Sequence, residues 1–172
     1  MVLRKLSIAM LGLLFVATSQ APLFGADDAG SKKLLKLLSK ELHLERSELS
    51  VEPLENTCLQ SEFVEDVSRV FQGDKAIGFV VSAVGKGRYD SFNYLVYYNE
   101  DREVELVSVT AYYSDHGNEI TSRRWLHQFN GYDGGDLDYG DEVQAISGAT
   151  LSASSIAKGI REITMLLQDC NF

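Results

Sequence analysis

The small residues SGAT at 147–150 are the part of the sequence best suited to holding a ligand. A helical pattern follows them directly, and the short apolar run EVQAI precedes them, so we expect a joint between a strand and a helix. A helix start offers unpaired backbone N–H groups and the positive end of the helix dipole, both of which favour a bound phosphate. Gly148 lets the backbone approach a ligand closely. The hydroxyls of Ser147, Thr150 and Ser152 could hydrogen-bond a phosphate or be esterified to one.

The same stretch also suits an ordinary helix start. Ser and Thr are favoured N-cap residues, and Gly is common in turns. Residue types alone therefore leave both interpretations open, a helix cap and a phosphate site.

The longer stretch VQAISGATLSASSIAKGI resembles the signature of the FMN-binding domain family. This family includes the flavin-carrying subunits of sodium-pumping NADH:quinone reductases and Rnf complexes, and small exported proteins. Its motif reads Asp-x-x-Ser/Thr-Gly-Ala-Thr-x-Ser/Thr, and the resemblance covers about residues 78–167. It implies that Thr150 carries FMN through a phosphoester, installed from FAD by an exported flavin transferase. The other implied cofactor-binding residues of the motif are Ser147, Gly148, Ala149 and Ser152.

The resemblance also bears on three further positions. His116 and Gly117 stand where the family carries a loop near the flavin, so His116 is either a contact to the ring or ribityl chain or an ordinary exposed loop residue. Gln144 stands where the family has Asp, six residues before Thr150. A neutral amide there supports an alternative, namely an exported binding or interaction module of the same fold that carries no covalent flavin.

Hydrophobic periodicity predicts the elements that would position these residues. The runs RVFQGDKAIGFVVSAV and SFNYLVYYNEDREVELVSVTAYY each predict two antiparallel strands, joined at a Gly-Asp turn and at residues 99–101. Alternation predicts that residues of the second run share faces in two groups, Phe92, Tyr94, Val96 and Tyr98, and Val107, Val109, Ala111 and Tyr113.

Helical spacing appears in three places. It places Leu34, Leu35, Leu38 and Leu42 on one face of a first helix, with lysines opposite, for packing on the core or, alternatively, contact with a membrane surface. NEITSRRWLHQF predicts a second helix, and 151–167 a third, with Ile156, Ile160, Ile163 and Leu167 inward. Residues 44–60 read as irregular. We therefore expect an α+β fold, an antiparallel sheet with packed helices, like that of FMN-binding domains.

Aromatic residues near the expected site allow two interpretations. Trp125 and Phe129 lie one helical turn apart and could line a slot for the flavin ring, although such a pair is more often part of the core. Tyr112 and Tyr113 are adjacent at a strand end, so one of them should face inward.

The domain plan begins with a signal peptide at residues 1–26, where the basic MVLRK precedes an uncharged apolar stretch. Residues 27–60 form an N-terminal helix and lead-in, and residues 61–172 form the FMN-binding-like domain. Export would place the protein in the periplasm, or associated with the outer face of the cytoplasmic membrane. In that oxidising compartment, Cys58 and Cys170 could form a disulfide.

Several classes of function lack support. A net charge of −9 disfavours nucleic-acid binding. The acidic run DGGDLDYGDE does not match an EF-hand, and no catalytic or metal-ligating set stands out. We predict an exported FMN flavoprotein acting in extracytoplasmic electron transfer, a redox carrier rather than a self-contained enzyme. Its expected partners are the flavin transferase and either redox proteins or a membrane electron-transfer complex.

Overall fold

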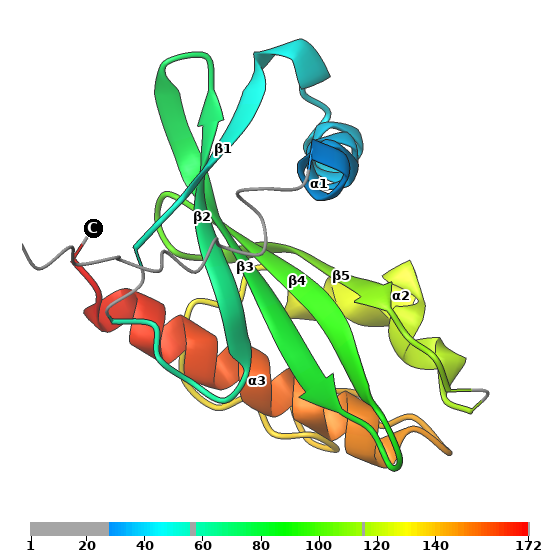
Figure 1. Ribbon diagram of the computed structural model, residues 1–172. Helices are drawn as coiled ribbons and strands as arrows, with labels where there is room; N and C mark the ends of the chain where they lie inside the picture. Colours follow the sequence, from blue (N-terminus) through cyan, green and yellow to red (C-terminus); the bar gives the residue numbers. More distant parts are fainter. Residues whose placement is uncertain (1–27, 56–57, 115, 172) are drawn as a thin grey trace, which may run out of the picture.

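Five antiparallel strands form a single sheet in the computed structural model, which describes residues 28–55, 58–114 and 116–171 (Figure 1). The strands are β1 (Leu49–Pro53), β2 (Val64–Gln72), β3 (Lys75–Lys86), β4 (Ser91–Asn99) and β5 (Val104–Ala111). Each strand pairs with the next one in the sequence. The two predicted strand pairs are confirmed, with turns at Gly73 and at residues 99–101.

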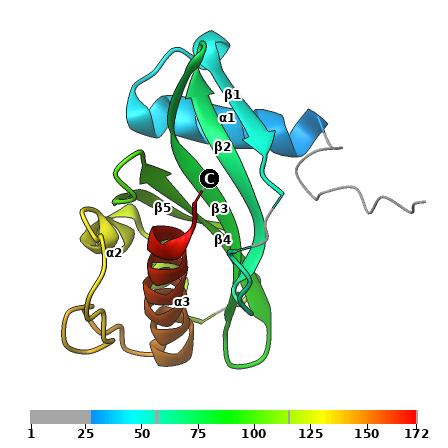
Figure 2. The same cartoon turned by 90° about the vertical axis from the view of Figure 1, so that its left-hand side faces the viewer.

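Two helices pack on opposite faces of this sheet, α1 (Asp28–Leu42) and α3 (Thr150–Asp169) (Figures 1 and 2). The remaining helical segments are one turn long: α2 (Arg123–Leu126) and the 3-10 turns η1 (Arg46–Glu48), η2 (Asn118–Thr121) and η3 (His127–Phe129).

The predicted fold class is corrected by this architecture. The described chain is a five-stranded antiparallel sheet with helices added to it, and it agrees only loosely with the expected α+β domain of the FMN-binding type. Two local errors contributed. The segment read as irregular contains β1, and the expected second helix is broken into three single turns. Ser122 causes one break, because its extended backbone ends η2 while its hydroxyl caps α2 by accepting from Trp125 N.

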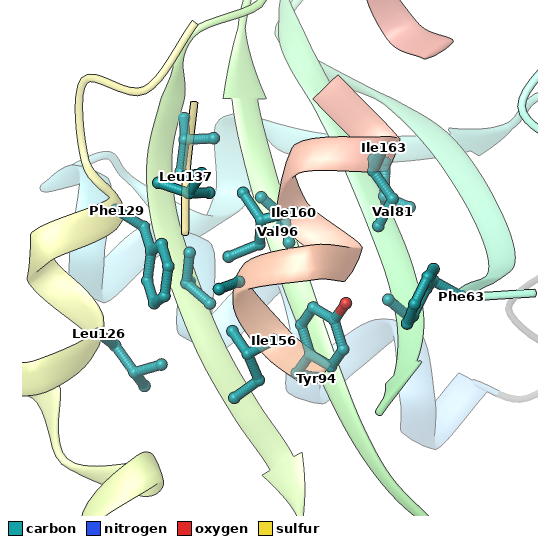
Figure 3. Close-up of a cluster of buried hydrophobic side chains, with 14 of the residues drawn as sticks. Phe63, Val81, Tyr94, Val96, Leu126, Phe129, Leu137, Ile156, Ile160 and Ile163 are labelled. Carbon is teal, nitrogen blue, oxygen red and sulfur yellow. The ribbon is translucent and has the colours of Figure 1, made fainter. Parts of the chain in front are cut away.

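The alternation along β4 divides the apolar residues between the two faces of the sheet. Phe92, Tyr94, Val96 and Tyr98 belong to the core under α3, as predicted, whereas Leu95 and Tyr97 belong to the cluster under α1. Figure 3 shows the first of these clusters between α3 and the strands. The prediction for β5 holds for Val107 and Val109 but is wrong for Tyr113, which is 78% exposed.

The inward face of α3 follows the predicted spacing. Ile156, Ile160, Ile163 and Leu167 are all fully buried. Buried apolar side chains at intervals of three and four residues bring one stripe of the helix onto the sheet. Because this stripe fixes the rotation of α3, it also fixes the direction of Thr150 at the start of the helix.

The N-terminal helix packs on the opposite face, so the core-packing interpretation is confirmed. Leu34 and Leu38 are buried against Leu49, Val70 and Leu95. The lysines of α1 are exposed to solvent.

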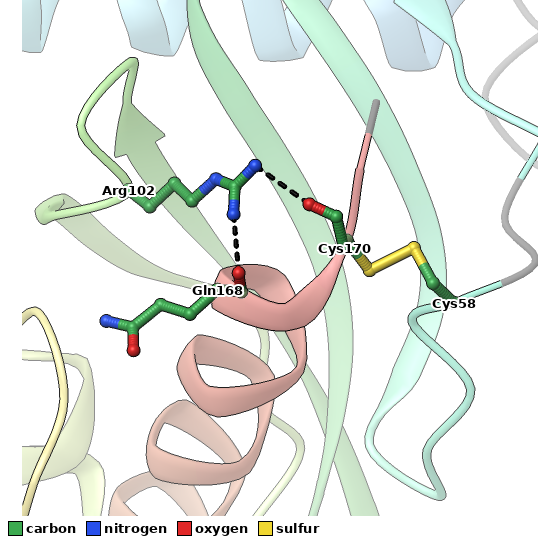
Figure 4. Close-up of a disulfide and its surroundings, with 4 residues drawn as sticks. All are labelled: Cys58, Arg102, Gln168 and Cys170. Carbon is green, nitrogen blue, oxygen red and sulfur yellow. Dashed lines mark hydrogen bonds between the residues drawn. A yellow bond between two sulfur atoms is a disulfide. The ribbon is translucent and has the colours of Figure 1, made fainter.

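A disulfide and an arginine hold the end of α3. Cys58 and Cys170 are bonded, with their Cα atoms 5.7 Å apart. The guanidinium of Arg102 donates to the carbonyl oxygens of Gln168 and Cys170 at 2.7 and 2.8 Å (Figure 4). Cations at a helix C-terminus satisfy carbonyls that have no partner within the helix. The C-terminus is therefore fixed to the lead-in segment and to the β4–β5 turn.

The expected signal peptide, 1–26, lies outside the described residues. Within the described ranges, no helix combines the length and apolar character needed to cross a membrane.

Candidate functional site

A cavity of about 440 Å³ lies beside the start of α3. Three segments line it: the β3–β4 turn, the loop after β5 and the first turn of α3. They are far apart in the sequence, and the sheet and α3 bring them together. The lining residues are Gly87, Arg88, Tyr89, Asp90, Ser91, Phe92, Tyr112, Tyr113, Ser114, His116, Gly148, Ala149, Thr150, Leu151 and Ser152.

The β3–β4 turn contacts α3 directly. The backbone N–H of Lys86 donates to Ser155 Oγ at 2.8 Å, and Gly87 N donates to Asp90 O at 2.9 Å. A Cβ at Gly87 would lie 2.9 Å from Asp90 O and 3.2 Å from Ser152 Oγ, so the small residue permits this approach. These contacts place the turn against one wall of the cavity.

The loop after β5 forms a second wall. Tyr112 Oη donates to the carbonyl oxygen of His116 at 2.7 Å, and its ring packs edge-on against Phe92. Gly117 has φ +78°, and a Cβ there would come within 2.8 Å of Ala149 Cβ. A glycine is therefore required for the loop to approach the helix start. Tyr112 is the inward residue of the Tyr112–Tyr113 pair, so that prediction is confirmed.

The first turn of α3 offers backbone N–H donors, and within the described residues no side chain caps them. Ala149 occupies the N-cap position and makes no side-chain hydrogen bond, and the first turn contains no acidic residue. A cap would normally satisfy one of these backbone N–H groups. The Thr150 side chain is exposed at the first helical position, whereas Ser152 is buried 3.5 Å from Tyr112 Oη. The helix-cap interpretation of the hydroxyls therefore lacks its hydrogen bond.

The structure brings most of the predicted site residues together. Gly148, Ala149, Thr150, Ser152 and His116 line the cavity, and Gly117 lies behind its wall. The exception is the hydroxyl residue at the start of the motif: Ser147 is exposed on the turn and is not among the lining residues.

The expected strand before this turn is wrong, apart from an isolated bridge between Tyr139 and Val143. The backbone N–H groups of this segment donate to side chains instead of to a neighbouring strand. Gln144 N donates to Gln128 Oε1, and Ile146 N donates to Tyr139 Oη. The helix is therefore preceded by a loop held by side chains.

Sequence reasoning placed Tyr113 near the site but missed Tyr89 and Leu151, which join it in an exposed apolar rim around the cavity. Tyr89 is 81% exposed, Tyr113 78% and Leu151 57%, and all three line the cavity. Among the described residues, Met165 is the one other large apolar side chain with comparable exposure. The guanidinium of Arg88 lies over the Tyr89 ring at 5.5 Å. The available signal was the turn sequence GRYD, but nothing in the sequence places that turn beside Thr150.

Other candidate residues take structural roles. Trp125 and Phe129 pack edge-on at 5.3 Å and are buried, which confirms the core interpretation over the flavin slot. Trp125 Nε1 donates to the carbonyl of Gln144, whose side chain is exposed. Arg161 pairs with Asp136 and Asp138 of the acidic loop. Across the described ranges, no group of three or more His, Cys, Asp or Glu residues could hold a metal ion.

No family model matches the chain, and no curated protein matches it. The resemblance to FMN-binding domains therefore rests on the motif residues and stays a prediction.

Proposed function

We propose that this protein is an exported FMN carrier, with the cofactor attached to Thr150 through a phosphoester, and that it transfers electrons outside the cytoplasm. One observation carries the proposal: the exposed Thr150 hydroxyl stands at the uncapped start of a 20-residue helix, in the wall of a 440 Å³ cavity. A cavity of this size falls in the range of small-molecule sites, roughly 300–1,000 Å³.

The residues around the cavity fit the parts of FMN. The uncapped N–H groups of α3 and the helix dipole suit a phosphate. Tyr89 and Tyr113 offer exposed rings to a planar aromatic group, and Arg88 adds a positive charge on the same turn as Tyr89. The Ser114 hydroxyl, the His116 imidazole and the backbone of both residues would meet the polar ribityl chain.

Attachment would proceed as a phosphoryl transfer from FAD, catalysed by a flavin transferase. The Thr150 oxygen forms a bond to the FMN phosphorus, the pyrophosphate bond of FAD breaks, AMP leaves, and the threonine proton is released. The exposure of Thr150 at the first helical position would let a separate enzyme reach its hydroxyl.

Bound FMN would supply the electron transfer, and this chain would tether and orient it. Tyr89 and Tyr113 would hold the ring at the surface, where a redox partner protein or a membrane complex could approach. The hydrogen bond from Tyr112 to His116 would keep the loop against the cavity. In this proposal Thr150 is an attachment point, and the protein is a carrier rather than an enzyme with its own substrate.

Intact mass spectrometry tests the proposal. The chain is co-expressed with a flavin transferase, beside Thr150→Ala and the neighbouring hydroxyl control Ser147→Ala. Wild type and Ser147→Ala should gain the mass of FMN minus water, and Thr150→Ala should gain nothing. An unmodified wild type, with a control substrate modified in the same cells, would overturn covalent carriage.

The exposed amide of Gln144 favours a second candidate function. Where the family motif has a carboxylate, this chain presents a neutral side chain outside the cavity lining. A module that binds flavin without a covalent bond, or binds another partner, would fit this substitution. Yellow colour that is lost on denaturation would support this candidate over covalent carriage.

A further inference from the structure

A second and larger cavity, a groove of about 630 Å³, lies on the sheet face opposite α3. Helix α1 crosses this face and leaves part of β4 and β5 uncovered (Figure 2). The groove is defined by Gly30, Lys33, Leu34, Lys36, Leu37 and Lys40 of α1, and by Glu65, Ser82, Asn93, Leu95, Ser108, Val109, Thr110 and Ala111 of the sheet.

The helical wall of this groove is cationic. Lys33, Lys36 and Lys40 lie three and four residues apart, so they follow one edge of α1. All three are exposed, and none forms a salt bridge within the part of the chain that the structure describes. In a chain of net charge −9, three unpaired lysines along a single groove are a local reversal of charge.

The floor of the groove is apolar. Of its three leucines, Leu37 is partly exposed and offers the accessible surface, while Leu34 and Leu95 are buried beside it. The far wall carries hydroxyls and an amide, from Ser108, Thr110 and Asn93. The single carboxylate of the lining, Glu65, accepts a hydrogen bond from Asn93 at 2.9 Å and is thus held at the sheet wall, away from the lysine edge.

We propose that this groove binds a single-chain anionic amphiphile, an alkyl carboxylate of the fatty-acid type. The alkyl chain lies over the leucine floor, where it is removed from water. The carboxylate reaches the lysine edge, whose long side chains keep their ammonium groups in solvent while their stems cover the alkyl chain. The groove is concave, with α1 on one side and the sheet on the other, so it favours a narrow ligand over a flat membrane surface. The groove is separate from the Thr150 cavity, and the proposal does not depend on flavin.

Calorimetric titration of the full chain with decanoate, below its micelle concentration, tests the proposal. Lys33→Gln/Lys36→Gln/Lys40→Gln should weaken binding roughly tenfold, because three ion-pairing partners are lost. Lys75→Gln/Lys86→Gln/Lys158→Gln, with the same change in charge at exposed lysines elsewhere, should leave binding unchanged. Decanol, which has the same chain length without the charge, should bind wild type more weakly and should not distinguish the two triple variants.

A variant that fills the groove gives an independent measurement. Thr110 is exposed in the lining, so Thr110→Trp should occupy the groove without disturbing the core and should abolish decanoate binding. Unchanged circular dichroism and melting temperature would establish that the variants fold. The proposal is overturned if wild type binds no decanoate at millimolar concentration, if both triple variants bind equally well, or if the chain binds only to anionic vesicles.

Discussion

At the scale of single residues, the Thr150 site is characterised by the lack of capping and acidic side chains in the first turn of α3. Among the described residues, no side-chain hydrogen bond caps the first turn of α3, and no carboxylate lies in that turn. The exposed rings of Tyr89 and Tyr113 stand at the same cavity, although solvent exposure of large apolar side chains is normally limited to scattered positions. These features favour a bound anionic and aromatic ligand over a plain helix start.

Restoring the acidic residue of the motif should improve attachment. Under limiting transferase, we expect Gln144→Asp to raise the rate of flavinylation by about tenfold. One added charge interaction changes a rate by roughly that factor. The measurement is the ratio of modified to unmodified chain by intact mass over time, with the exposed Gln60→Asp as the control. An equal rate in wild type and Gln144→Asp would mean that the neutral residue is tolerated.

Asp66 should make stability depend on pH. Burial raises the pKa of its carboxyl and outweighs the backbone hydrogen bond at Val67, and Asp66 Oδ2 is buried without a partner in the described structure. Since the folded-state pKa exceeds the unfolded one, the folded protein binds the proton more tightly. The free energy of unfolding therefore falls as pH rises from about 3.8 through the raised value.

The corresponding variant is Asp66→Asn. It should raise the melting temperature by a few degrees at pH 7, and the gain should vanish below about pH 3.8, where the wild-type carboxyl is protonated in both states. Thermal melts from pH 3 to 8 measure this, with the exposed Asp74→Asn as control. A gain that is independent of pH would contradict the electrostatic explanation.

At the scale of elements, α3 approaches the sheet closely at one glycine. A Cβ at Gly159 would overlap Tyr94 Oη and lie 3.0 Å from the Phe63 ring. Tyr94 Oη is buried and has no hydrogen-bond partner in the described structure, and burial strongly raises the pKa of this phenol. Figure 3 shows the Tyr94 ring between α3 and the strands. The helix thus packs on a tyrosine whose hydroxyl only Gly159 can accommodate.

A double-mutant cycle tests this contact. Gly159→Ala should destabilise the fold by about 1–3 kcal/mol through overpacking, although alanine is the better helix former. Tyr94→Phe removes the unpaired hydroxyl and should be neutral or stabilising. In the Tyr94→Phe background, Gly159→Ala should lose most of its cost.

The measurement for this cycle is urea unfolding. Gly30→Ala in α1 serves as control, because a Cβ there meets nothing within 4 Å. If Gly159→Ala lowers the free energy of unfolding equally in the two backgrounds, the clash is with the Phe63 ring and not with Tyr94 Oη.

At the scale of the whole molecule, the disulfide joins segments 112 residues apart and closes the domain. Cross-linking a loop of that length stabilises the folded state by about 3–5 kcal/mol, since it restricts the unfolded chain. Cys58→Ser/Cys170→Ser should therefore melt roughly 10 °C lower.

Differential scanning calorimetry with and without reductant measures this loss. The wild type should approach the double variant when reduced, and the variant should not respond to reductant. A wild type that keeps its melting temperature under full reduction would show that Arg102 and the core suffice to hold the end of α3.

Local patterns in the sequence determined the strands of the two hairpins and the buried stripe of α3. Period-2 and period-3.6 patterns depend only on side chains that are near in sequence, so they can be read without a fold. The motif also indicated Thr150, Gly148, Ala149 and Ser152, and the wider resemblance indicated His116; the structure places all five around one cavity. The resemblance and the residue types were sufficient for that set.

Other features depended on the tertiary structure. Ser122 and Tyr139 redirect the backbone through side-chain hydrogen bonds, which broke the expected helix and replaced the expected strand before the motif. The meeting of the β3–β4 turn with the start of α3 brought Arg88 and Tyr89 to the cavity. The bond between Cys58 and Cys170 required that both ends of the domain reach one side of the sheet. Such contacts join residues distant in sequence, and only the packing of α3 on the sheet brings them within reach.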